Sequence, residues 1–213
     1  DSKTPNKKLI FEGIKKKHLI IFLPMKTNLA NCPQWLSNKI SKMGGSISFY
    51  EFMQIVLNDP KNGFYGSGKA KIAIDGDFVT SSTISDDFAF LLAKQILDWL
   101  KQISKNLTTI DTLSVTEVGS GNGSLMKGII KYLDKNDKNF LEKISFKIIE
   151  FNPGMIEKQK KNFRKYLDNG INIKWLNFDQ IENSSLNGVI LANEVLDAFP
   201  VERIQYYNGE LYR

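Results

Sequence analysis

Short apolar runs alternate with amphipathic stretches from residue 113 onward. Runs rich in apolar and β-branched residues predict strands at Leu113–Val118, Ile144–Glu150, Ile171–Trp175 and Gly188–Ala192. Apolar residues at helical spacing predict helices at Ser124–Leu133 and Pro153–Tyr166. Strands that alternate with helices imply βαβ crossovers, so we expect an α/β fold with a doubly wound, mostly parallel sheet.

Two helices are predicted upstream of this alternating region. Ser48 can cap a helix that Asn58-Asp59-Pro60 stops, and a second amphipathic helix is expected at Asp86–Trp99. Residues 1–45 are polar and rich in lysine apart from the apolar run 19–23, and we expect them to form an N-terminal helical extension. At the other end, a strand at Ile204–Tyr207 and the turn residues Asn208-Gly209 predict the first half of a hairpin.

Composition narrows the class of protein. The chain has 213 residues, of which 42% are apolar and 24% charged, as in an ordinary globular domain. Because Cys32 is the only cysteine and His18 the only histidine, the sequence excludes an internal disulfide, and we expect neither a metal site nor a hydrolase that uses a catalytic histidine. The run 19–23 is too short for a membrane span or a signal peptide, so neither membrane insertion nor export is expected.

The net charge of +6 is spread along the chain. The lysine-rich stretch 158–165 adjoins Glu157 and is typical of a solvated helix face. We therefore do not expect a nucleic-acid partner, although the charge permits one.

The strongest chemical signal is a glycine-rich turn between the first predicted strand and its helix. Glu117 precedes Gly119, Gly121 and Gly123 in the order E-x-G-x-G-x-G. Alternate glycines let a ligand approach bare backbone at the carboxyl end of a strand, where open α/β sheets bind nucleotide-like ligands. The dinucleotide fingerprint has its third glycine one place later, so the spacing favours S-adenosylmethionine over NAD. We assign these four residues to cofactor binding.

Two more acids follow the second and third predicted strands. Glu150 ends the second strand, where a carboxylate can accept hydrogen bonds from a ribose diol, and we assign it to the cofactor rather than to an exposed strand end. Asp179 follows the third strand and is a candidate for the adenine amino group. A plain loop aspartate explains Asp179 equally well.

A cluster of polar residues follows the fourth predicted strand, at the same sheet edge as the glycine turn. Asn193 is assigned to the cofactor site, and Glu194 and Asp197, three residues apart, would share a face if the turn were helical. Paired carboxylates beside a methyl donor can orient a cationic or amine acceptor, so we predict that Glu194 and Asp197 are catalytic. The alternative is that they stabilise a helix N-terminus.

A further glycine pattern resembles an ATP-binding P-loop but lacks one of its essential residues. Gly63 to Lys69 matches the P-loop spacing G-x-x-x-x-G-K, but Ala70 replaces the Ser/Thr that holds magnesium. A Pro/Asn turn, rather than a strand, precedes it. An ATP-binding loop is therefore rejected.

With these motifs in order, the chain resembles the MidA-like family of class I methyltransferases, which includes the mitochondrial complex I assembly-factor protein arginine methyltransferase. The resemblance covers about residues 46–205. The blocks that carry it are Ile47–Met53, Asn58–Tyr65, Gly76–Ser81, the glycine turn, Glu150–Pro153 and Leu191–Pro200. The most specific are Gly76-Asp77-Phe78-x-Thr80-Ser81 and Asn193-Glu194-x-x-Asp197-Ala198-x-Pro200.

The resemblance implies S-adenosylmethionine as cofactor and a protein substrate, with an arginine on a respiratory-complex subunit as the acceptor. It implies that a loop containing Gly76, Asp77, Thr80 and Ser81 helps to close the cofactor site. Residues 46–110 would then cap that site, and residues 111–213 would form the cofactor-binding domain. The family pattern continues Thr-Ser with Pro-Glu, whereas this chain has Ser82-Thr83.

The family's C-terminal part is expected to be missing from this chain. Location follows the source: mitochondrial in a eukaryote and cytoplasmic in a bacterium. Two other functions stay open, an RNA or small-molecule methyltransferase and a cofactor-binding assembly chaperone without turnover. A DNA amino-methyltransferase is disfavoured, because Asn193-Glu194-Val195-Leu196 stands where such enzymes have Asn/Asp-Pro-Pro-aromatic.

Overall fold

The computed structural model describes residues 32–71, 76–77, 85–105, 112–182 and 186–212. Its helices are α1 (Gln34–Lys42), α2 (Phe49–Asn58), α4 (Asp86–Ser104), α5 (Ser124–Asn136), α6 (Lys138–Leu141) and α7 (Pro153–Asp168). Its strands are β1 (Leu113–Val118), β2 (Ile144–Ile149), β3 (Ile173–Leu176), β4 (Asn187–Leu191), β5 (Gln205–Tyr207) and β6 (Glu210–Tyr212). Two short 3-10 turns lie at Phe178–Gln180 and Leu196–Ala198. The alternation of strands and helices predicted from residue 113 onward is confirmed.

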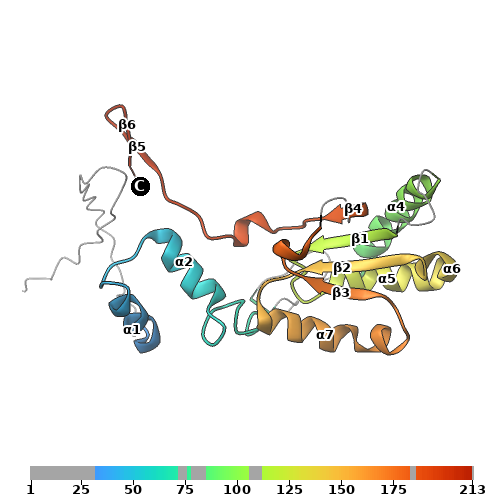
Figure 1. Ribbon diagram of the computed structural model, residues 1–213, viewed down its shortest axis with the longest axis horizontal. Coiled ribbons are helices and arrows are strands. Elements are labelled where there is room, and N and C mark those ends of the chain that lie inside the picture. Colours follow the sequence, from blue (N-terminus) through green and yellow to red (C-terminus); the bar gives the residue numbers. More distant parts are fainter. Residues whose placement is uncertain (1–31, 72–75, 78–84, 106–111, 183–185, 213) are drawn as a thin grey trace, which may run out of the picture.

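The main sheet has four parallel strands in the order β3-β2-β1-β4. The chain first builds outward from β1 to β2 and β3, and then crosses to the other side of β1 to form β4 (Figure 1). This reversal makes a topological switch point between β1 and β4. Open α/β sheets bind ligands at such a point, outside the carboxyl ends of the strands.

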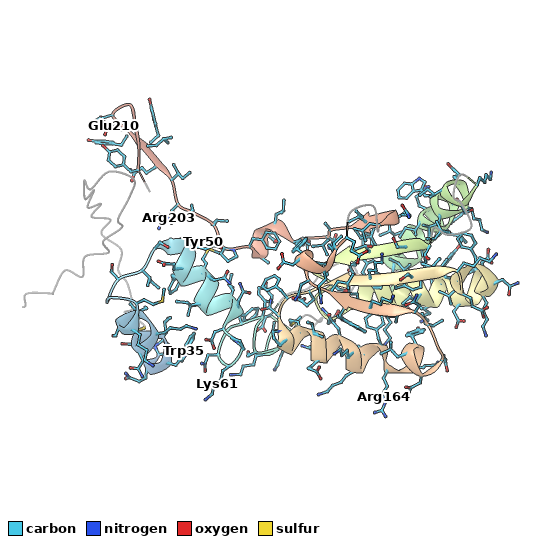
Figure 2. The ribbon with its side chains drawn as sticks, viewed as in Figure 1. Trp35, Tyr50, Lys61, Arg164, Arg203 and Glu210 are labelled. Carbon is cyan, nitrogen blue, oxygen red and sulfur yellow. The ribbon has the colours of Figure 1, made fainter. Side chains whose placement is uncertain are left out.

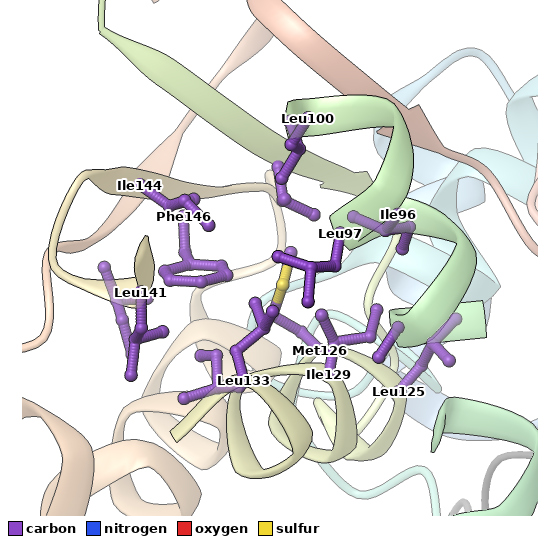
Figure 3. Close-up of a cluster of buried hydrophobic side chains, with 14 of the residues drawn as sticks. Ile96, Leu97, Leu100, Leu125, Met126, Ile129, Leu133, Leu141, Ile144 and Phe146 are labelled. Carbon is purple, nitrogen blue, oxygen red and sulfur yellow. The ribbon is translucent and has the colours of Figure 1, made fainter. Parts of the chain in front are cut away.

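The core lies between this sheet and a layer of helices. Leu125, Met126, Ile129 and Leu133 recur on one face of α5 and are buried. In Figure 3 they meet Ile96, Leu97 and Leu100 of α4 and Phe146 of β2. Full burial of each such side chain stabilises the fold by roughly 1.5–3 kcal/mol, so this cluster fixes the strands on which the site is built.

The predicted cap of α2 is confirmed. The Ser48 hydroxyl accepts from the Glu51 N–H at 3.1 Å, and the Glu51 carboxylate accepts from the Ser48 N–H at 2.7 Å. Each end of this pair satisfies a backbone donor that the helix leaves free. At the other end of α2, Asp59 accepts from the Lys39 ammonium of α1 at 2.7 Å, which joins the two helices.

The loop after α2 is fastened to α7. The Gly154 N–H donates to the Gly66 carbonyl at 3.2 Å, and a Cβ on Gly154 would collide with the Gly68 backbone. The Lys158 ammonium donates to the Ala70 carbonyl at 2.6 Å. Gly68, one of the two glycines that match the P-loop spacing, therefore serves a close approach between the loop and the start of α7.

The C-terminal hairpin is also confirmed. β5 and β6 pair antiparallel, and the turn residues Asn208 and Gly209 have φ of 49° and 80°. The hairpin stands away from the main sheet (Figure 1). The segment that leads to it passes α2, where the Arg203 guanidinium lies 5.4 Å from the centre of the Phe49 ring, and Figure 2 shows Arg203 beside Tyr50 of the same helix.

The N-terminal extension is helical over α1, while the run 19–23 lies outside the described residues. Within the described part of the chain, no helix is long and apolar enough to cross a membrane. The boundaries drawn at residues 45 and 110 stay predictions.

Candidate functional site

A cavity of about 260 Å³ opens at the carboxyl edge of β1, β2 and β4. Three groups of residues line it, from the glycine turn, from the end of β2 and from the segment after β4, together with two residues of the α2 region. They are Asn58, Tyr65, Glu117, Gly119, Ser120, Gly121, Asn122, Leu125, Glu150, Phe151, Asn152, Met155, Asn193, Glu194, Val195, Asp197, Ala198 and Phe199. The cavity therefore lies at the switch point of the sheet.

The glycine turn presents backbone to this cavity. Gly119 and Gly121 line it, and Gly121 has φ of 55°, a left-handed conformation that residues with a Cβ rarely adopt. Gly123 does not line the cavity. Its Cβ would lie 2.6 Å from the Phe163 ring of α7, so the third glycine lets α7 pack against the start of α5. The structure supports cavity positions for the first two glycines and a packing role for the third.

Glu117 is buried at the base of the cavity, with 3% of its surface exposed. Its carboxylate accepts from the Ser120 hydroxyl at 2.5 Å. Burial raises the pKa of Glu117 to about 7, against hydrogen bonds from Ser120 and from the Met126 N–H that lower it. Glu117 can therefore change charge near neutral pH.

Glu150 is held at the end of β2 by hydrogen bonds from backbone and side-chain donors. Its Oε1 accepts from the N–H groups of Phe151 at 3.1 Å and Asn152 at 3.0 Å, and its Oε2 accepts from the Gln159 amide at 3.3 Å. Burial raises the pKa of Glu150, and these hydrogen bonds oppose the rise. The carboxylate is thus oriented toward the cavity, with acceptor capacity remaining on Oε2.

The segment after β4 brings Asn193, Glu194 and Asp197 to the cavity. The condition under which Glu194 and Asp197 would share a helical face is not met, because Glu194 has a left-handed φ of 50° and precedes the short 3-10 turn that contains Asp197. Between them, Val195 is buried, and a Cβ on Gly119 would lie 3.3 Å from its side chain. This packing fixes the segment against the glycine turn.

Among the lining residues that were not assigned to the site from the sequence, two come from the region of α2, before the sheet. Asn58 ends α2 and Tyr65 lies in the loop that α7 fastens. Burial, and to a lesser extent the negative charge of Asp197, raises the pKa of the Tyr65 hydroxyl. Tyr65 therefore lines the same cavity as Asp197 and lies near enough for the charge of Asp197 to act on its hydroxyl.

Several predicted residues lie elsewhere. Asp179 is exposed in the 3-10 turn after β3 and does not line the cavity. Gly76 and Asp77 do not line it either. Asp77 instead pairs with Lys71, donating to its carbonyl at 2.7 Å and accepting from its N–H at 2.9 Å. Thr80 and Ser81 lie outside the described residues.

The described lining suits S-adenosylmethionine in two respects. Gly119 and Gly121 leave the backbone bare at the end of β1, and Glu150 holds a carboxylate where ribose hydroxyls can donate to it. The carboxylates of Glu194 and Asp197 are placed to attract positive charge. The cavity thus combines residues suited to a nucleoside with two carboxylates suited to a cation.

The curated relatives of the chain are named methyltransferases. At 25% identity over 184 residues, it resembles the mitochondrial protein arginine methyltransferase NDUFAF7 homolog of Drosophila melanogaster, over 78% of this chain and 40% of that protein. Its identity to mitochondrial NDUFAF7 of Bos taurus, also named a protein arginine methyltransferase, is 25% over 182 residues, 77% of this chain and 40% of that one. The chain spans about two fifths of the length of these curated relatives.

Two solved structures from Burkholderia thailandensis share the fold. An uncharacterized protein is 26% identical with a TM-score of 0.61, over 83% of this chain and 42% of that one. A second, bound to S-adenosyl-homocysteine, is 29% identical with a TM-score of 0.58, over 78% of this chain and 41% of that one.

A match to a protein-family model identifies the family of the chain. The model for S-adenosyl-L-methionine-dependent methyltransferases matches residues 91–213, more than half of the chain. That range contains the glycine turn, Glu150 and the segment after β4, and the resemblance drawn from the motifs is confirmed. The chain belongs to the family of S-adenosyl-L-methionine-dependent methyltransferases.

Proposed function

We propose that the protein transfers a methyl group from S-adenosylmethionine to an arginine side chain of a protein substrate. One observation carries the proposal: a single cavity is lined both by the glycine turn with Glu150 and by Glu194 with Asp197. The first pair of elements suits the nucleoside of the cofactor. The second suits a cationic acceptor.

Each group of residues has its own task. When bound, S-adenosylmethionine supplies a methyl carbon that its sulfonium makes electrophilic. Gly121 gives room for close backbone contact, and Glu150 accepts from the ribose hydroxyls. Most of what methyl transfer needs beyond this is in-line placement of the acceptor nitrogen.

Glu194 and Asp197 provide that placement. A guanidinium donates several hydrogen bonds in a planar fork, and charge-assisted bonds to carboxylates are each worth roughly 1.5–3 kcal/mol. As the new N–C bond forms and the methyl–sulfur bond breaks, the guanidinium must lose a proton, and the two carboxylates are placed to accept it. Tyr65 lines the same cavity as these two carboxylates.

The names of the curated relatives support a protein acceptor, and the motif resemblance supports a respiratory-complex subunit. By the same reasoning, the location is mitochondrial in a eukaryote and cytoplasmic in a bacterium.

Asn193 and Glu117 line the same cavity, and we assign them to the part that holds the cofactor.

The test is radiolabelled methyl transfer into whole-cell lysate by the full-length protein, followed by identification of the labelled species. We expect label in protein, on arginine. Label in RNA or in small molecules instead of protein would contradict a protein acceptor and identify the other class as the substrate. Cofactor binding with no transfer to any fraction would favour an assembly chaperone and contradict the proposal.

A further inference from the structure

Gln159 is a polar side chain in the interior of the protein. It lies on α7, and none of its surface is exposed. Its amide nitrogen donates to the Gly121 carbonyl at 2.9 Å and to Glu150 Oε2 at 3.3 Å. Its amide oxygen accepts from the Trp175 indole N–H of β3 at 2.9 Å. One side chain therefore joins the glycine turn, the end of β2 and β3.

The bonding capacity of the amide is well matched to this place. A glutamine has two N–H donors, and here both have partners, while its oxygen has one. A buried polar group left without partners costs about 1–3 kcal/mol, so an apolar residue would serve better if only packing mattered. The amide is explained by the two groups that it holds, the Gly121 carbonyl and the Glu150 carboxylate.

The oxygen of Glu150 that Gln159 contacts is the one left for a ligand. Oε1 already accepts from the N–H groups of Phe151 and Asn152, which use its two lone-pair directions. Oε2 accepts from the Gln159 amide at 3.3 Å. The position of Oε2 relative to the backbone of Gly121 is therefore set by Gln159.

We propose that Gln159 is a positioning residue for the cofactor, which fixes Glu150 Oε2 against the Gly121 backbone and so sets the affinity for the ribose. This inference rests on the proposed function, because it requires the cofactor to lie in this cavity. Gln159 acts through Glu150 and does not itself line the cavity.

The chain offers a matched control one turn further along α7. The Asn162 amide donates to the Asn122 carbonyl of the same glycine turn at 2.8 Å, but Asn162 is exposed and has no bond to Glu150. Asn162→Leu and Gln159→Leu thus each remove an amide from the same helix and turn. Only Gln159→Leu releases the ribose-binding carboxylate.

The experiment is calorimetry of the full-length protein with S-adenosylhomocysteine and with its 2′-deoxy and 3′-deoxy forms. In Gln159→Leu we expect binding of S-adenosylhomocysteine about tenfold weaker, with the discrimination against at least one deoxy form reduced by a similar factor. Asn162→Leu should keep both within about twofold. A loss of fold stability alone would weaken all three ligands equally.

A second variant covers the case in which Gln159→Leu does not fold. Trp175→Phe keeps an aromatic ring, smaller than the indole, and removes the N–H that donates to the Gln159 oxygen. It should reduce the same discrimination by a few-fold. Equal weakening of all three ligands, or unchanged binding, in the folded variant would overturn the proposal. Failure of the unmodified protein to bind S-adenosylhomocysteine would instead overturn the cofactor assignment, and the positioning role with it.

Discussion

The hydroxyl of Ser120, in the turn that follows β1, donates to the carboxylate of Glu117 near the end of β1 over 2.5 Å, and both side chains are buried. Burial is the larger effect on Glu117 and raises its pKa from 4.5 to about 7. The folded protein therefore binds more protons than the unfolded chain between these two values. The contribution of Glu117 to stability is complete below pH 4.5 and is lost as the pH rises through 7.

Replacing Glu117 by Gln should remove this loss, because the amide can still accept from Ser120 and never ionises. The free-energy difference at stake is on the order of 3 kcal/mol. Thermal denaturation at pH 5 and pH 8 should show Glu117→Gln gaining stability relative to the parent as the pH rises. Parallel melting curves at both pH values would contradict the assigned burial of the charge.

Gly121→Val should abolish binding of S-adenosylhomocysteine. The β-branched side chain would project where the backbone must approach the cofactor, and the left-handed φ of 55° adds strain of roughly 1–2 kcal/mol. Gly170→Val is the control, because Gly170 also has a left-handed φ, of 79°, and a Cβ there meets open space. Calorimetry should find binding in Gly170→Val and none in Gly121→Val. Equal affinities would remove the glycine turn from the site.

Glu194→Gln and Asp197→Asn should separate binding from transfer. If these carboxylates hold the acceptor, each change weakens its use by roughly 1.5–3 kcal/mol and leaves cofactor affinity nearly unchanged. If they only stabilise the turn after β4, melting temperature falls slightly and transfer persists. Cofactor affinity, melting temperature and transfer rate should be measured for both variants. An unchanged rate in both would exclude these carboxylates from the mechanism.

The strands and helices of the sheet domain could be predicted from the sequence because each signal is local. β1 has the predicted bounds, Leu113 to Val118, since a stretch rich in apolar and β-branched residues leads directly into glycine. The cap of α2 follows from Ser48 and Glu51 at capping-box spacing. Gly121 and Glu150 were placed at the cavity because the carboxyl ends of parallel strands meet at one edge.

The remaining site residues depend on contacts between distant segments. Tyr65 reaches the cavity because Gly154 and Lys158 of α7 hold its loop, a relation that no local pattern indicates. Gly123 has the spacing of a cofactor glycine, yet its position is set by the Phe163 ring. The spacing of Glu194 and Asp197 left open whether their turn is helical, and the structure instead has a left-handed φ at Glu194, next to the packing of Val195 against Gly119.

The central claim is that the cavity between the glycine turn and Glu150 binds S-adenosylmethionine rather than a dinucleotide. The most direct test is calorimetry of the full-length protein with S-adenosylhomocysteine and with NAD, repeated on Glu150→Ala. We predict saturable binding of S-adenosylhomocysteine, no heat of binding with NAD, and at least about tenfold weaker S-adenosylhomocysteine binding in the variant, because the ribose loses its charged acceptor. Binding of NAD without S-adenosylhomocysteine, or equal affinity in Glu150→Ala, would contradict the claim.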